Sequence, residues 1–341
     1  MPSQRRESDL AVPQTRLDQR NAGQATVLNP FRRQATKAMV PQSAAFLDKR
    51  ILEALVNFSE SKVSRVKRSL CAIAVALTAA ITPAAADEAP GTIKGSTLSP
   101  TPANLALTWD RAHLVLPAGL AAGKRWQGAP AMAPEIAGKA PLVILLHGSS
   151  GIAPAVTEFQ NWLADALGVA SVAPDSLAIP DRLTYTSPVG KDIYERVHAL
   201  RLAELEHALQ ASRAWVWVDR SRIILAGTSE GAVAASRYAG TESAARLIYS
   251  WSCERNYFVD EPRPGFRADE PVLNAISARD PYFSTRNAWN GDYAVTGTCA
   301  AALEGKANST VYVVDADVHT ILNREEVRQV TAAFLKRVLG L

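Results

Sequence analysis

The sequence predicts an α/β protein with a mostly parallel central sheet that carries helices on both faces. Short apolar runs rich in β-branched residues alternate with longer segments of helical spacing between residues 141 and 339. This alternation is typical of βαβ units, in which helices bury parallel strands. The second observation is the stretch ILAGTSEGAV (223–232), where an apolar run enters a serine flanked by glycines. A sharp turn from a strand into a helix needs such small residues.

Charge and composition limit the possible classes of function. The chain has 341 residues, 48% of them hydrophobic, and a net charge of +4, so it can bury a substantial core. The positive charge belongs to the N-terminal region, because residues 1–86 carry a net +7 and residues 87–341 a net −3. No basic stripe interleaved with aromatic residues follows residue 87, so we expect no nucleic-acid partner.

Residues 63–86 have the layout of a secretory signal peptide. Basic residues from Lys62 to Arg68 precede the apolar core Leu70–Ile81, and Ala84-Ala85-Ala86 supplies a small-residue cleavage site. The core is too short to span a membrane, and Cys71 lies within it, so we expect no lasting membrane or lipid anchor. The predicted product starts at Asp87 and is periplasmic or secreted.

Residues 1–62 do not fit the start of an exported chain. Either the start codon is assigned too far upstream and translation begins near Val63, or the segment is a long, disordered leader. We therefore predict three parts: an upstream extension over 1–62, a signal peptide over 63–86 and a single α/β domain over 87–341.

The elements of that domain follow in order. Strands are predicted at Val169–Ala173, Arg246–Trp251 and Pro271–Ser277 and, more strongly, at Pro141–Leu146, Arg222–Ala226 and Thr310–Val314. Helical spacing predicts helices at Val156–Leu167, Ile193–Leu209, Glu230–Tyr238 and Glu325–Leu339. Leu105–Leu116 is interpreted as an antiparallel strand or hairpin leading into the sheet.

Ser229 is the candidate nucleophile, because Gly227-Thr228-Ser229-Glu230-Gly231 fits G-x-S-x-G between a strand and a helix. A glycine-rich turn can instead hold a phosphate, but this one lacks both G-x-G-x-x-G and the P-loop lysine. A serine needs a base, and only His319 follows the last strand, as the order Ser…Asp/Glu…His requires. His198 and His207, on a predicted amphipathic helix, are expected at the surface.

Asp280 is the candidate acid, because it follows the predicted strand Pro271–Ser277 in SARDPY and lies between the serine and the histidine. The other carboxylates that remain open are Asp260, Asp269, Asp292, Asp315 and Asp317. Oxyanion donors are expected from backbone N–H groups. One is that of Glu230, and the other that of Ser149, in the His147-Gly148-Ser149-Ser150-Gly151 loop after the first predicted parallel strand. His147 is assigned a structural role.

Over residues 140–339 the chain resembles the α/β-hydrolase superfamily, and within it the dienelactone hydrolase-like branch. The resemblance rests on LLHGSSG, VAPDS with Pro180-Asp181-Arg182, WVDRSRIILAGTSEGA, SARDPY and DVHTIL. It implies an α/β-hydrolase fold and hydrolysis by a catalytic triad. Dienelactone hydrolases have a cysteine nucleophile, and Ser229 in its place favours a general carboxylic ester.

The expected function is that of an exported serine hydrolase acting on a small-molecule ester through an acyl-enzyme, with no metal or organic cofactor. A peptidase of the same fold and a non-catalytic binding protein are the alternatives. The sequence leaves the substrate and the oligomeric state open. Aromatic residues near the predicted site either line a pocket or belong to the core: Trp251, Tyr257, Phe258, Tyr282 and Phe283.

Cys253 and Cys299 are the cysteines that remain after the predicted signal peptide. An even number in a chain bound for an oxidising compartment indicates a possible disulfide. Two buried free thiols are the alternative.

Overall fold

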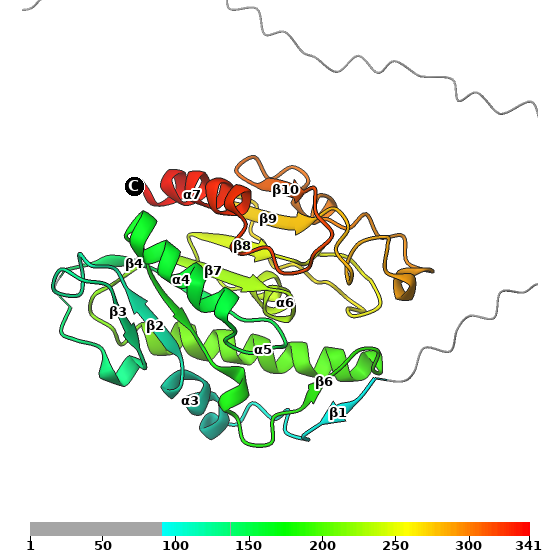
Figure 1. Cartoon of the computed structure of the whole chain (residues 1–341), viewed down its shortest axis with the longest axis horizontal. Helices are drawn as coiled ribbons and strands as arrows, with labels where there is room; N and C mark the ends of the chain where they lie inside the picture. The colour runs from blue at the N-terminus through cyan, green and yellow to red at the C-terminus, as the bar shows by residue number, and fades with distance from the viewer. Residues whose placement is uncertain (1–90, 137) are drawn as a thin grey trace, which may run out of the picture. The chain divides into compact units, whose positions relative to one another are not determined.

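The computed structural model describes residues 91–136 and 138–341 (Figure 1). The predicted extension over 1–62 and signal peptide over 63–86 lie outside the described residues. The described part forms an eight-stranded sheet in the order β10-β9-β8-β7-β4-β5-β2-β3. Its strands are β2 (His113–Leu116), β3 (Trp126–Gly128), β4 (Ala140–Leu146), β5 (Ala170–Ala173), β7 (Val218–Thr228), β8 (Ala245–Tyr249), β9 (Val272–Ser277) and β10 (Thr310–Val314).

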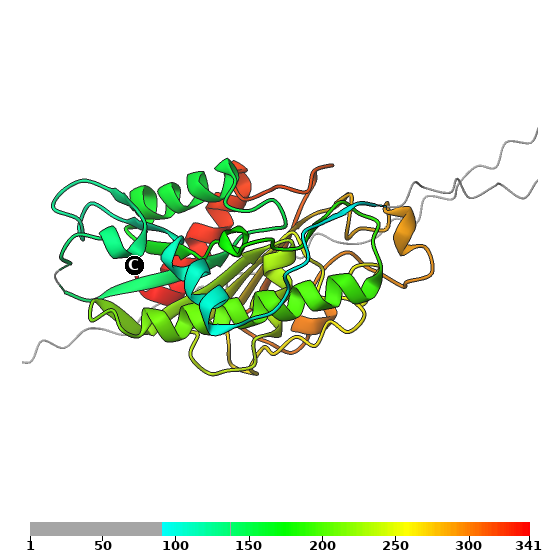
Figure 2. The same ribbon diagram turned by 90° about the horizontal axis from the view of Figure 1, so that it is seen from below.

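Six of these strands are parallel, and β2 is antiparallel to both β5 and β3. Helices α4 (Pro154–Leu167) and α7 (Glu325–Leu339) cover one face, and α5 (Lys191–Ser212) and α6 (Glu230–Arg237) cover the other (Figure 2). The structure thus confirms the predicted mostly parallel sheet with helices on both faces. None of the helices in the described ranges is long and apolar enough to cross a membrane.

The buried strand β4 shows how the sheet supplies two cores. Its seven residues are all buried. Val143 and Leu145 pack with α4 and α7, whereas Leu142, Ile144 and Leu146 pack with α5 and α6. Because successive side chains of a strand point to opposite faces, a strand that is buried on both faces appears in the sequence as the continuous apolar run APLVILL.

A second, two-stranded sheet joins β1 (Ile93–Lys94) to β6 (Thr184–Tyr185) in antiparallel fashion. Short 3₁₀ helices complete the described elements: η1 (Pro130–Met132), η2 (Ser176–Ala178), η3 (Ala288–Asn290) and η4 (Ala301–Leu303). The segment between β5 and α5 therefore carries η2 and β6 before it enters the helix.

The interpretation of Leu105–Leu116 as a strand or hairpin is wrong over most of its length. Helix α3 spans Pro102–Asp110, and only His113–Leu116 forms a strand, β2. The Thr101 side chain accepts a hydrogen bond from the Asn104 N–H at 3.2 Å and proline occupies the first turn, so both start signals of a helix are present. These signals lie upstream of the apolar segment on which the strand prediction rested.

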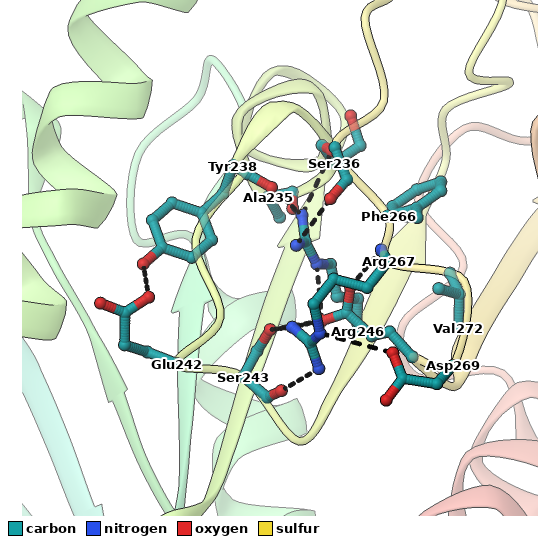
Figure 3. Close-up of polar contacts among 12 residues, drawn as sticks. Ala235, Ser236, Tyr238, Glu242, Ser243, Arg246, Phe266, Arg267, Asp269 and Val272 are labelled. Atoms are coloured by element: carbon teal, nitrogen blue, oxygen red, sulfur yellow. Dashed lines mark hydrogen bonds and ion pairs between the residues drawn. The ribbon is translucent and has the colours of Figure 1, made fainter.

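Arg246, at the start of β8, holds the C-terminal end of α6 in place (Figure 3). Its buried guanidinium donates through Nη1 to the carbonyls of Ala235, Ser236 and Tyr238 at 2.8, 3.2 and 2.6 Å. Its Nε lies 3.0 Å from Oε1 of Glu270, and both side chains are fully buried. A cation satisfies the last carbonyls of a helix favourably, so this ion pair fixes α6 against the sheet.

We predict that Arg246→Met lowers the free energy of unfolding by about 3 kcal/mol, because it removes the donor to the α6 carbonyls and leaves the buried Glu270 carboxylate with Arg267 as its only cationic partner among the described residues. Urea denaturation of the mature protein measures the loss. The matched control is Arg279→Met, because the Arg279–Asp315 pair is exposed and surface ion pairs contribute little. Equal stability of the two variants would contradict the assignment.

Candidate active site

The turn between β7 and α6 holds Ser229 in a strained backbone conformation. Its φ of 54° and ψ of −123° are rare for a residue with a side chain. The Ser229 N–H donates to the Tyr249 carbonyl of β8 at 3.0 Å. Glycine is required on both sides, because a Cβ at Gly227 would lie 2.3 Å from the Gly231 carbonyl oxygen and one at Gly231 would lie 2.4 Å from that of Leu146. The segment GTSEG has the form of a nucleophile elbow.

His319 and Asp280 form a hydrogen-bonded pair between the β10–α7 and β9–η3 loops. The His319 Nδ1 lies 2.8 Å from Oδ2 of Asp280, whose side chain is fully buried, whereas that of His319 is 20% exposed. Oδ1 of Asp280 accepts from the backbone N–H groups of Tyr282 and Phe283 at 2.9 and 3.1 Å. An acceptor at Nδ1 favours the tautomer that leaves Nε2 unprotonated and able to take a proton.

The other candidate acids lie in surface ion pairs or loops. Asp315 pairs with Arg279 at 2.7 Å, and Asp317 pairs with Arg286 at 2.6 Å. Of the remaining three, Asp260 pairs with Arg255, Asp269 with Arg267, and Asp292 is exposed. Within the described part of the chain, Asp280 is thus the carboxylate that the structure places against His319.

The loop after β4 approaches Ser229 closely. A Cβ at Gly148 would lie 3.3 Å from the Ser229 Cβ and 3.8 Å from its Oγ, so a side chain here would require Ser229 to shift by a few tenths of an ångström. Ser149 and Glu230 line the same cavity as Ser229, and neither of their backbone N–H groups donates a hydrogen bond within residues 91–136 and 138–341. Neither group is therefore engaged within the described residues, and their role as oxyanion donors stays a prediction.

His147 fixes that loop from behind, in the structural role assigned to it. Its buried ring donates from Nδ1 to the Gly148 carbonyl at 2.6 Å and accepts from the Ser176 N–H at Nε2, at 3.0 Å. The Arg201 guanidinium donates to the His147 carbonyl at 2.8 Å. Burial lowers the pKa of His147 well below its ordinary value and the Arg201 charge lowers it further, so the ring is neutral and serves both bonds.

The side chain of Glu230 belongs to a buried charge network that the sequence did not reveal. Its carboxylate accepts from Arg182 and from the Tyr185 hydroxyl, each at 2.9 Å, and lies 3.6 Å from Arg201. Burial by itself raises the pKa of Glu230, but the two arginines lower it below its ordinary value. Arg201 also pairs with Glu204 at 3.0 Å. The only sequence signal is the i, i+3 spacing of Arg201 and Glu204 on α5.

The prediction that His198 lies at the surface is wrong. The residue is 3% exposed and its ring lines the cavity with Ser229. It shares a face of α5 with Tyr194 and Arg201, and α6 packs against this helix. The buried face of α5 therefore includes polar residues beside its apolar ones. Burial lowers the pKa of His198 to about 4, and Arg237 adds to this effect. His207 is half-buried, nearer to the expectation.

One cavity of about 550 Å³ joins these groups. It contains Ser229, His319, the 148–151 loop and an aromatic wall; Phe258, Tyr282 and Phe283 line it, together with Tyr185, Tyr194 and Trp289. Trp251 belongs to the core and is fully buried, and Tyr257 packs behind Phe258. Among the described residues, no cluster of three or more His, Cys, Asp or Glu side chains could hold a metal ion.

Comparison with known proteins gave structural matches only, since no family model and no curated protein matches the chain. Esterase PE8 shares 17% identity over 59% of this chain and 94% of its own, with a TM-score of 0.43. A putative dienelactone hydrolase from Klebsiella pneumoniae shares 16% over 61% and 88%, with a TM-score of 0.41. Est1E from Butyrivibrio proteoclasticus, solved with ferulic acid, shares 17% over 67% and 94%, also with a TM-score of 0.41.

The described residues form a mostly parallel α/β sheet with helices on both faces. The elbow follows β7 in the middle of the sheet, and the candidate acid and base follow β9 and β10. In an α/β sheet, functional groups gather at the carboxyl ends of the strands. Ser229, Asp280 and His319 therefore follow three parallel strands whose carboxyl ends lie at the same edge of the sheet.

A disulfide joins Cys253 and Cys299, the predicted pair, with their Cα atoms 4.7 Å apart. It closes a loop with a sequence separation of 46 residues, which contains Asp280 and the wall residues Tyr282 and Phe283. The Cys299 N–H also donates to Oδ1 of Asn274 on β9 at 3.0 Å. The bridge thus restrains both ends of the segment that carries the candidate acid.

We predict that the mature protein holds no free thiol and that Cys253→Ala/Cys299→Ala lowers the free energy of unfolding by about 2–4 kcal/mol, because the unfolded chain gains loop freedom. Thiol counting in denaturant and urea unfolding measure the two effects. Reducing agent should destabilise the wild type to a similar extent and leave the double variant unchanged. Two free thiols in untreated exported protein would contradict the prediction.

Proposed function

We propose that the protein is a serine hydrolase that cleaves carboxylic esters through an acyl-enzyme intermediate. The observation that carries the proposal is the hydrogen bond between His319 and the buried Asp280. His319 lines the same cavity as Ser229, which lies on its strained turn. A nucleophile, a base and a group that orients the base are the parts that acyl transfer requires.

In the proposed mechanism, the Ser229 hydroxyl attacks the ester carbonyl while Nε2 of His319 takes its proton. Asp280 holds the tautomer of the ring and stabilises the imidazolium. The oxyanion forms beside the backbone N–H groups of Ser149 and Glu230. His319 then gives the proton to the leaving alcohol, and a water molecule, activated by the same nitrogen, releases the acid and restores Ser229.

The form of the cavity supports a small ester as substrate. Its volume of about 550 Å³ falls within the range of small-molecule sites, which combine apolar walls with a few polar groups. Apart from the elbow and the 148–151 loop, much of its lining is aromatic or aliphatic, including Val156, Val233 and Leu322.

We further propose that the protein works outside the cytoplasm after removal of residues 1–86. The signal-peptide layout of residues 63–86 motivates this proposal. The Cys253–Cys299 disulfide supports it, because such bonds persist in oxidising compartments.

We predict that a fluorophosphonate probe labels the mature protein at Ser229, since the turn exposes an activated hydroxyl, and that Ser229→Ala abolishes labelling. Hydrolysis of 4-nitrophenyl acetate should fall by about 10⁴-fold or more in this variant. Parallel assays with 4-nitroacetanilide measure amide cleavage. Labelling that persists in Ser229→Ala would refute the nucleophile, and a preference for the anilide would favour a peptidase.

The matched test of the acid compares Asp280→Ala with Asp315→Ala. The first variant should lose about 10²–10⁴-fold in kcat, because the His319 ring loses its orienting carboxylate. The second should keep near wild-type activity, because Asp315 pairs with Arg279 at the surface. If Asp280→Ala kept its activity and Asp315→Ala lost it, the assignment of Asp280 as the acid would be wrong.

We predict that a bacterial host with an intact secretion pathway exports the protein with Asp87 as its first residue, because Ala84-Ala85-Ala86 forms the cleavage site. Intact mass spectrometry of the periplasmic and external fractions measures this product. The control replaces Ala84 and Ala86 by bulky residues, which should block cleavage. A full-length chain recovered from the cytoplasm would contradict export.

A further inference from the structure

Aromatic rings run in an unbroken series from His319 to helix α5. The ring centroids of Tyr282 and Phe283 lie 4.6 and 5.8 Å from that of His319. Phe258 lies 5.8 and 5.5 Å from these two rings, and Tyr194 lies 5.2 Å from Phe258. All five residues line the cavity, so this wall offers ring faces and edges to a flat ligand group.

The hydroxyls of the tyrosines at the α5 end of this wall form hydrogen bonds with neighbouring residues. The Tyr194 hydroxyl donates to Oγ of Ser187 at 2.8 Å and accepts from the Val189 N–H at 3.2 Å. The Tyr185 hydroxyl donates to Glu230, and the two rings meet edge to face with centroids 5.1 Å apart. Their polar atoms are satisfied, which leaves their rings for packing.

His198 adds an imidazole to this wall, where Thr186 and Ser187 also line the cavity. It lies one helical turn after Tyr194 on α5, is 3% exposed and lines the cavity. Its Nδ1 is buried and has no hydrogen-bond partner within the described residues. Buried polar atoms are almost always hydrogen-bonded, so an unpaired nitrogen on a side chain that lines the cavity indicates a hydrogen-bond partner supplied by a bound ligand.

The charged groups around His198 come from two helices. Glu195 and Arg201 lie on α5, and Glu230 and Arg237 lie on α6. Burial and the two arginines keep the ring neutral, so one of its nitrogens accepts and the other donates. A neutral imidazole in an aromatic wall suits a weakly acidic hydroxyl better than it suits a charged group.

Building on the proposed ester hydrolase function, we propose that the substrates are esters that carry a hydroxylated aromatic ring. The ring packs against Tyr185, Tyr194 and Phe258, and its hydroxyl forms a hydrogen bond with His198. The hydroxylated ring can belong to the acid part or to the alcohol part of the ester. Two series of substrates distinguish these two positions.

The expected selectivity is large enough to measure. A site that hydrogen-bonds a substrate hydroxyl rejects the analogue without it, because a buried polar group then remains unpaired. One such bond to a neutral group corresponds to a preference of about ten- to a hundredfold in kcat/KM.

The experiment measures kcat/KM of the mature enzyme for matched esters with and without a ring hydroxyl. One series varies the acid, as methyl 3-(4-hydroxyphenyl)propanoate against methyl 3-phenylpropanoate. The other varies the alcohol, as 2-(4-hydroxyphenyl)ethyl acetate against 2-phenylethyl acetate. The wild type should prefer the hydroxylated member of one series, which then identifies the side of the ester that the wall binds.

Variants connect this preference to His198. His198→Leu should bring the ratio of the two kcat/KM values close to one, and His198→Asn, which keeps a hydrogen-bonding group, should restore part of it. The control is His207→Leu, on the same helix but not among the cavity residues, which should keep the wild-type ratio. A ratio that His198→Leu leaves unchanged would overturn the proposal.

A binding measurement separates failure of the inference from failure of the proposed function. Calorimetry with the Ser229→Ala variant and 3-(4-hydroxyphenyl)propanoate, against 3-phenylpropanoate, reports recognition without turnover. Ester hydrolysis with no preference for a ring hydroxyl in either series would refute the inference and leave the esterase function intact. Binding that depends on the ring hydroxyl, without hydrolysis of any ester, would refute the esterase function. It would still support binding of the hydroxylated ring beside His198.

Discussion

The structure depends on one constraint: Ser229 must keep a left-handed backbone between a central strand and a helix. Such a conformation costs on the order of 1–3 kcal/mol and persists only where its surroundings hold it. Here Gly227 lets β7 approach α6, and Gly231 lets α6 approach β4, at distances that a Cβ would forbid. The Ser229 N–H is bound to β8. At the far end of α6, Arg246 holds the helix carbonyls (Figure 3). The turn is therefore fixed from both of its sides.

The buried charge network extends this constraint to the proposed oxyanion site. Arg201 contacts the Glu230 carboxylate on the elbow side and the His147 carbonyl on the β4 side, so one guanidinium links the two segments that supply Ser149 and Glu230 N–H groups. Buried ion pairs add little net stability, because desolvation offsets their attraction. Their value here lies in geometry, since backbone donors act on an oxyanion only when they are held in position before it forms.

Much of this arrangement could be predicted from the sequence, because parallel strands bring their carboxyl ends to one edge. The predicted strand Thr310–Val314 and helix Glu325–Leu339 match the structure residue for residue. Chain order selected His319, and Asp280 was preferred to five other carboxylates because it follows a predicted strand. The errors share a physical cause. His198 and Arg201 are polar residues that tertiary packing buries on α5, and helical periodicity, which marks only the apolar stripe, cannot show them. The start of α3 was missed because the cap at Thr101 lay outside the apolar pattern.

The wall of the cavity depends on the first described residues of the chain. Arg182 and Tyr185, which contact Glu230, lie in a segment whose main-chain groups bond to residues 91–97. The Gly91 N–H donates to Pro188 at 2.8 Å, the Thr97 N–H donates to Asp181 at 2.9 Å, and the Leu183 N–H donates to Thr97 at 3.0 Å. Cleavage after Ala86, as proposed, leaves all of these contacts in the mature chain. A processing site beyond residue 97 would instead remove β1, which pairs with β6 beside the cavity. The proposed export and the proposed catalysis therefore both require that the mature protein begins before β1.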